Sequence, residues 1–124
     1  MTTLEIEEIT ELEKELNEKV EGLESMAWHF LKKDKASSSR IQVKIGIMID
    51  CIYNLGLRYI SHFTDNVYGY LENQEYDPIV ILITNLHNID KKLVAIDWER
   101  EVEQNELDMY LLSVNAITKL YLLK

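Results

Sequence analysis

The chain has 124 residues, which is enough for one domain with a buried core. Hydrophobic residues make up 47% of it, which excludes a disordered protein, and it contains only four Gly and one Pro. Because a β-rich domain needs many tight turns, this composition favours a few long helices. The net charge of −9 disfavours non-specific nucleic-acid binding, since phosphate repels an acidic protein at long range.

The sequence indicates a cytoplasmic protein that does not enter a membrane. Its single cysteine, Cys51, excludes an intrachain disulfide and fits a reducing compartment. The first residues lack the basic start and apolar core of a signal peptide. The longest uncharged run, 78–89, is too short to span a bilayer.

Residues 1–33 are predicted to form a long acidic amphipathic helix. Thr2 and Glu5 have the spacing of a capping box, in which two side chains satisfy free amides at a helix start. Apolar residues then recur every three or four positions, at Ile9, Leu12, Leu16, Val20, Leu23, Ala27 and Phe30. At about 1.5 Å per residue the helix is about 45 Å long, so we expect it to extend past the rest of a small bundle.

Residues 41–50 allow two interpretations. Ile41, Val43, Ile45, Ile47 and Ile49 alternate as in a strand, and the β-branched run 78–84 would be a parallel neighbour. On a helix, an apolar face forms instead from Ile41, Ile45, Met48, Ile52, Leu55 and Tyr59. We therefore predict an all-α bundle of four or five helices, with an α/β fold containing strands near 41–50 and 78–84 as the alternative.

The remaining boundaries follow from local start and stop signals. The polar segment 34–39 is predicted to be a linker, with Ser39 and Gln42 capping the second helix. The region 64–76 is either a short helix or an extension of the second. Asp77 and Pro78 indicate a helix start that leads toward Trp98, and a last helix covers about 106–123. The chain 1–124 is thus one domain, with 40–124 as its helical core.

Asp50, Asn54, Arg58 and His62 recur every fourth residue and form a slanting polar strip on a helix. We interpret the strip as the solvated edge of a mostly buried helix. Arg58 and His62 also resemble the Arg…His motif of HEPN-type ribonucleases, which implies phosphate binding by the Arg and proton transfer by the His. That family keeps four to six residues between the pair, whereas three intervene here.

No catalytic, cofactor-binding or metal-binding set is predicted. Cys51 lies beside Asp50 and about three turns from His62, so we expect a buried inert thiol. His87 and Asp90 form a lone His-x-x-Asp pair without the Glu-x-x-His spacing of helical di-iron sites.

Two short segments resemble the small helical subunit of type III CRISPR effector complexes. These are S-S-S-R-I-Q at 37–42 and V-N-A-I-T-K-L-Y at 114–121, and the likeness is carried by Ser38, Ser39, Arg40, Ile41, Ala116 and Tyr121. Gln42 stands where that family has Arg, and the acidic N-terminal segment also differs. The resemblance implies a subunit of an RNA-guided nucleoprotein complex. Candidate phosphate contacts in the basic segment are Lys32, Lys33, Lys35, Arg40 and Lys44.

The leading functional prediction is a non-enzymatic helical protein-interaction module. Its narrow apolar stripe resembles a coiled-coil seam, and Tyr is favoured at interfaces because its ring buries while its hydroxyl stays wet. Candidate partner contacts are Leu12, Leu16, Leu23, Phe30, Trp28, Tyr68 and Tyr70. We expect an acidic inhibitor or immunity-type factor, or a subunit of a larger assembly, that binds a protein partner or itself.

Overall fold

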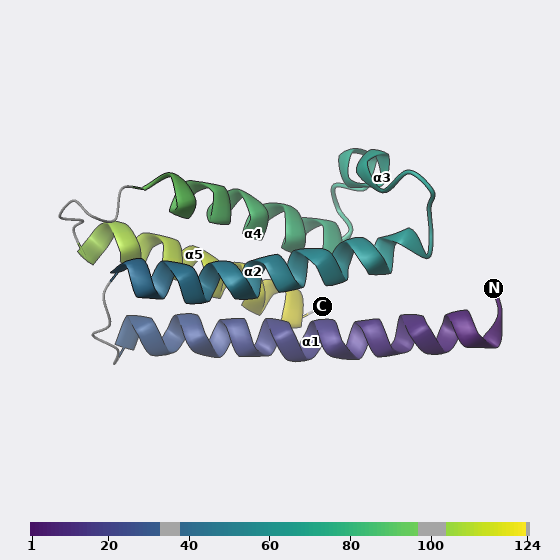
Figure 1. Ribbon diagram of the computed structural model, residues 1–124, viewed down its shortest axis with the longest axis horizontal. Helices are drawn as coiled ribbons and strands as arrows, with labels where there is room; N and C mark the ends of the chain where they lie inside the picture. Colours follow the sequence, from purple (N-terminus) through teal and green to yellow (C-terminus); the bar gives the residue numbers. More distant parts are fainter. Residues whose placement is uncertain (33–37, 97–103, 124) are drawn as a thin grey trace.

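The computed structural model describes residues 1–32, 38–96 and 104–123 (Figure 1). These residues form the helices α1 (Thr3–Lys32), α2 (Ser38–Ser61), α3 (Val67–Asn73), α4 (Pro78–Ala95) and α5 (Gln104–Leu122). No strand occurs in the described residues, so the all-α prediction is confirmed and the α/β alternative is wrong. None of these helices is long and apolar enough to cross a bilayer.

The four long helices form a bundle in which α1 packs on α2 and α5, and α4 packs on the same two helices from the other side. Figure 1 shows that each helix runs antiparallel to its two neighbours. The short helix α3 lies outside the bundle, where the chain passes from α2 to α4. The core is therefore the space enclosed by α1, α2, α4 and α5.

Residues 41–50 are helical although their apolar residues alternate. Ile41, Ile45 and Ile49 are buried in the core, whereas Val43 and Ile47 are 53% and 64% exposed. Alternate residues on a helix fall on different faces, and only the face that meets α1 and α4 is covered. The strand-like pattern thus arises because two extra β-branched residues stand on the outer face of α2.

Local hydrogen bonds explain where two of the helices begin. The Thr2 hydroxyl accepts from the Glu5 amide at 3.1 Å, and the Asp77 carboxylate accepts from the Ile79 amide at 2.8 Å, next to Pro78 in the first turn. Both starts were predicted. α2, however, begins at Ser38, so Ser39 lies inside its first turn and is not the cap.

The other predicted boundaries need small corrections. The region 64–76 contains a separate helix, α3, because the Asn66 side chain accepts from the Gly69 amide and caps it. α4 ends at Ala95 and α5 begins at Gln104. Trp98 and most of the predicted linker 34–39 lie outside the described residues.

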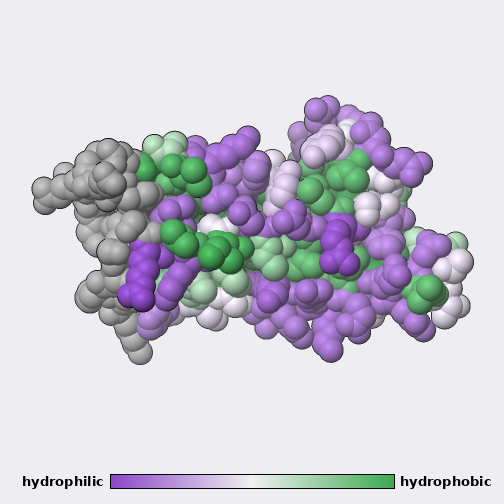
Figure 2. Space-filling view, in the orientation of Figure 1, coloured by the Kyte–Doolittle hydropathy of each residue, from purple (hydrophilic) through white to green (hydrophobic). Residues whose placement is uncertain are grey.

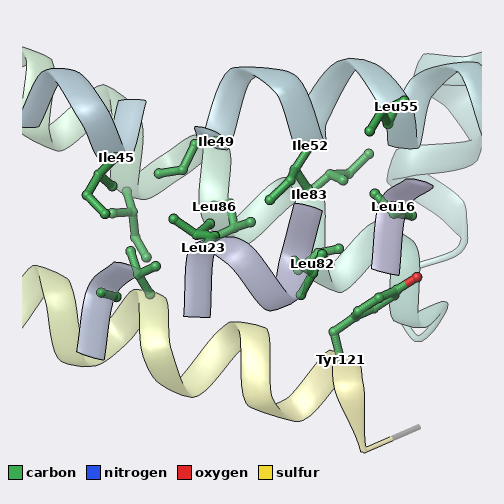
Figure 3. Packing of buried hydrophobic residues seen from close by; sticks show 14 of the residues in the cluster. Leu16, Leu23, Ile45, Ile49, Ile52, Leu55, Leu82, Ile83, Leu86 and Tyr121 are labelled. Atoms are coloured by element: carbon green, nitrogen blue, oxygen red, sulfur yellow. The ribbon is translucent and has the colours of Figure 1, made fainter. Parts of the chain in front are cut away.

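The apolar stripe of α1 lies inside the bundle (Figure 3). Leu16 and Leu23 point into a core that also contains Ile45, Ile49, Ile52, Leu82, Ile83, Leu86 and Tyr121. Leu12 and Phe30 are each only 5% exposed. All four stripe residues predicted as partner contacts are therefore core residues of the folded chain and are absent from its surface.

α1 is longer than its neighbour α5, with 30 residues against 19, and this difference shapes one end of the molecule. At about 1.5 Å per residue, α1 is roughly 16 Å longer than α5. Near the C-terminal end of α5, Tyr121 lies close enough to Glu13 to feel its charge. Residues 3–12 therefore extend beyond α5 and are called the α1 overhang below; α2 still packs beside them (Figure 1).

Candidate functional site

A groove runs between the α1 overhang and the end of α2. It encloses about 410 Å³ and is lined by Leu4, Glu7, Glu8, Glu11, Leu12 and Glu15 of α1 with Arg58 and His62 of α2. We call it the α1–α2 groove. Its lining combines an apolar base with carboxylates on one wall and two basic side chains on the other.

Helical spacing places the carboxylates in a row. Glu7, Glu11 and Glu15 are four residues apart, about 6 Å along the axis per step, and all three are exposed. Within the described part of the chain, none of them has a basic side chain within ion-pair distance. The spacing of these three residues is visible in the sequence, but their position opposite Arg58 and His62 is not.

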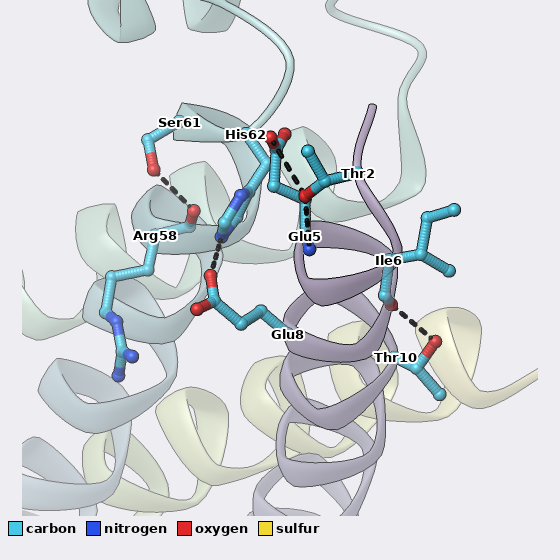
Figure 4. Close-up of polar contacts among 8 residues, drawn as sticks. All are labelled: Thr2, Glu5, Ile6, Glu8, Thr10, Arg58, Ser61 and His62. Carbon is cyan, nitrogen blue, oxygen red and sulfur yellow. Dashed lines mark hydrogen bonds and ion pairs between the residues drawn. The ribbon is translucent and has the colours of Figure 1, made fainter.

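The opposite wall of the groove carries part of the predicted polar strip. Asp50, Asn54 and Arg58 are exposed, whereas His62 is half-buried. The His62 Nε2 atom lies 3.9 Å from the Glu8 Oε2 atom, so this imidazole faces α1 (Figure 4).

Arg58 and His62 do not converge on a common point. Figure 4 shows the Arg58 guanidinium directed along α2 and away from the His62 ring. RNA cleavage by an Arg–His pair needs both groups to reach the same phosphate. This structure instead places both side chains in one wall of a groove whose other wall is acidic.

A second polar cluster joins α2 to α4. The Asp90 carboxyl shares a hydrogen bond with Asp50, and burial, together with the nearby Asp50 charge, raises the pKa of Asp90. His87 partly opposes this shift, and its ring stacks on Tyr53 with 4.5 Å between centroids. Gly46 leaves room for the pair, since a Cβ there would lie 3.1 Å from the Asp90 Oδ1 atom. No sequence pattern linked Asp50 to Asp90.

Replacing Asp90 by Asn is expected to raise the melting temperature at pH 7. The pKa of Asp90 is higher in the folded state than in the unfolded state, where it is about 3.9. The stability that Asp90 contributes is therefore fully present below the unfolded pKa. It is lost as the pH rises through the folded pKa. At neutral pH, Asn at position 90 carries no charge for Asp50 to repel, so the variant is more stable. At acidic pH the Asp90 carboxyl is itself uncharged, so the variant has no such advantage. Thermal unfolding at pH 7 and pH 4 measures the difference, with the exposed Asp65→Asn as control. A lower melting temperature of Asp90→Asn at pH 7 would contradict the expected repulsion.

Tyrosine hydroxyls connect the helices near the overhang. Tyr59 donates to the Glu13 carboxylate at 3.0 Å, and Tyr70 donates to the Asp77 carboxylate at 2.7 Å. Burial, helped by nearby carboxylates, raises the pKa of Tyr59 and of Tyr121 to about 12. The Tyr59 and Tyr121 phenols are therefore neutral at physiological pH, and the Tyr59 hydroxyl ties α2 to α1 as a hydrogen-bond donor. Tyr70, predicted as a partner contact, is half-buried and already bonded within the chain.

An apolar pocket of about 280 Å³ lies between the start of α4 and the end of α5. It is lined by Pro78, Ile81, Leu82, Ile117, Leu120, Tyr121 and Leu123. None of these lining residues is charged, and the Tyr121 hydroxyl is the sole polar side-chain group among them. Such a lining is suited to apolar groups.

The other predicted site residues lie apart from the groove. Trp28 and Tyr68 are exposed, and the Lys119 ammonium lies 5.3 Å from the centre of the Trp28 ring. Arg40 and Lys44 are exposed at the start of α2. Lys33, Lys35 and the Lys32 side chain lie outside the described residues.

No three His, Cys, Asp or Glu side chains of residues 1–32, 38–96 and 104–123 converge as a metal site. Cys51 is half-buried on α2. No protein-family model, curated protein or solved structure significantly matches this chain. Its function has to be inferred from the surfaces and grooves of the bundle.

Proposed function

We propose that the chain is a non-enzymatic helical protein-interaction module whose contact surface is the end of the bundle beside α3. One observation carries the proposal, namely the large apolar and aromatic side chains that are exposed there. They are Leu4 and Ile6 of the α1 overhang, Phe63 after α2, Tyr68 of α3 and Tyr76 before α4. We call these five residues the open-end surface.

The exposure of these side chains is not explained by the needs of the core. The stripe of α1 is already covered by α2 and α5, so the bundle has an apolar interior without them. Yet Leu4 and Tyr68 are 65% and 69% exposed, and Tyr76 is 86% exposed. Exposed large apolar side chains at one end of a bundle are typical of a contact surface, and Tyr is enriched at such surfaces. Figure 2 shows apolar groups among the polar residues at this end.

Charge favours a basic partner. Residues 1–25 contain nine Glu and two Lys, so the surface beside the overhang is strongly acidic. Complementary charge speeds the encounter with a basic protein and disfavours acidic ones. An acidic inhibitor that covers a basic surface and a subunit held in a larger assembly both fit this description.

Site-specific photo-crosslinking in cells that express the protein tests the proposal. A photo-reactive residue at Phe63 or Tyr68 is expected to capture the same discrete protein. Met109 and Leu112 on α5 provide matched controls because both are exposed and apolar but lie outside the open-end surface. Capture that is equally strong at the α5 positions, or absent from the open-end surface, would contradict the proposal.

A further inference from the structure

The α1–α2 groove has the length and the periodicity of a helix-binding site. Its lining runs from Leu4 to Glu15 along α1, which corresponds to about 16 Å, or three turns. Leu4 is largely exposed on it, and Leu12 lies at its buried base. Proteins commonly bind an amphipathic helix in such a groove, with its apolar face laid inward.

The acidic wall selects the charge of the occupant. Glu7, Glu11 and Glu15 repeat once per turn, so basic residues four apart on a helix alongside would meet them in register. A second copy of this chain carries the same net charge of −9 and is repelled, as is free nucleic acid. Charge complementarity therefore favours a basic amphipathic segment of another protein.

The opposite wall adds a selective element. Arg58 lines the same groove as Glu11 and Glu15, and the structure gives it no carboxylate within ion-pair distance among the described residues. A fully basic helix would be repelled by this guanidinium, whereas a helix with one acidic residue opposite it would be favoured. Proteins commonly gain specificity in this way, because a charge in the binding site repels partners that carry the same charge at that position.

We infer that the α1–α2 groove binds a basic amphipathic helix of a partner protein, with its basic side chains against Glu7, Glu11 and Glu15 and its apolar face on Leu4. This inference rests on the proposed function and names the chemistry of the partner. The groove adjoins the open-end surface through Leu4, which belongs to both. A partner helix in the groove would thus continue a contact made by the open-end surface.

Fluorescence anisotropy with designed peptides tests the inference on the full chain. The probe is a labelled amphipathic peptide of about 18 residues, five helical turns, with Leu on one face and Lys on the other. We expect saturable binding that weakens at least tenfold between about 0.05 M and about 0.5 M salt, because salt shortens the Debye length. A peptide with Glu in place of Lys, one with Ser in place of Leu, and a single-stranded RNA oligonucleotide are expected not to bind.

Matched variants locate the site. Glu7→Gln with Glu11→Gln is expected to weaken binding on the order of fivefold, since exposed ion pairs contribute modestly. Glu72→Gln with Glu75→Gln makes the same change in net charge at exposed positions outside the groove and is expected to leave binding unchanged. Arg58→Ala is expected to tighten binding of the all-Lys peptide about twofold, because a repulsive cation is removed.

Several outcomes would overturn the inference. These are absence of Lys–Leu peptide binding, equal weakening by both Glu pairs, weaker binding by Arg58→Ala, or tighter binding of RNA than of peptide. Circular dichroism of each variant shows whether the helices are intact. If peptide binding fails while Phe63 and Tyr68 still capture one protein, the groove is excluded and the interaction module stands. Failure of both experiments removes both proposals.

Discussion

Leu23→Ala is expected to lower the free energy of unfolding by about 3 kcal/mol. Leu23 is fully buried and belongs to the core cluster drawn in Figure 3. Truncation removes apolar contacts and leaves a cavity that rigid neighbours fill only in part, and such changes typically cost about 2–5 kcal/mol. Urea unfolding followed by circular dichroism measures the loss as a lower midpoint at constant slope.

Leu23→Ala also tests whether the apolar stripe of α1 stabilises the core or mainly contacts a partner. Leu112→Ala on α5 is the control, since this side chain is 55% exposed and its loss is expected to change stability by less than about 0.5 kcal/mol. If the stripe mainly contacted a partner, Leu23→Ala would leave the isolated chain as stable as Leu112→Ala does. An equal effect of the two variants would therefore contradict the packing described here.

Gly56→Ala is expected to destabilise the protein by about 1–3 kcal/mol, which is the usual cost of overpacking a core. A Cβ at Gly56 would lie 2.6 Å from the Cγ2 atom and 3.1 Å from the Cδ1 atom of Ile83 on α4. Ile is branched and buried, so it cannot move aside without shifting α2 from α4. This clash exceeds the roughly 1 kcal/mol by which Ala is preferred to Gly in a helix.

Gly22→Ala is the matched control for that variant. Gly22 is also helical, but its nearest contact would be the flexible end of Met48 at 3.4 Å, an ordinary separation. Only the helix preference remains there, so Gly22→Ala is expected to stabilise the protein by about 0.5–1 kcal/mol. Thermal unfolding of both variants is the measurement, and stabilisation by Gly56→Ala as well as by Gly22→Ala would show that the close approach of α2 and α4 is not tight.

The sequence predicted those parts of the fold that depend on short-range chemistry. The helix starts at Thr2 and Asp77 need only a side-chain oxygen and an amide two or three residues away. The buried faces of α1 and α4 follow from apolar spacing alone. The outer residues Val43 and Ile47 made 41–50 ambiguous, because a single sequence does not show which of two apolar faces will be covered.

The candidate site could not be predicted in the same way. The α1–α2 groove exists because α1 is longer than α5 and because residues 4–15 lie beside 58 and 62, far apart in the chain. The polar strip was recognised from its spacing, and the structure places Asp50, Asn54 and Arg58 on the surface as the solvated-edge interpretation requires. The neighbours of the strip include Glu8 of α1 and Asp90 of α4, and no local pattern in the sequence predicts these two contacts.

The packing of α1 against α5 has a consequence for how the chain folds as it is made. The two helices lie at opposite ends of the described sequence, and each covers apolar residues of the other. Translation at about 5–20 residues per second separates their completion by on the order of 5–20 s. During that interval α1 can pair only with α2, so part of its leucine stripe faces water or a chaperone. The four-helix core can close only after α5 has also left the ribosome, because α5 covers apolar residues of both α1 and α4.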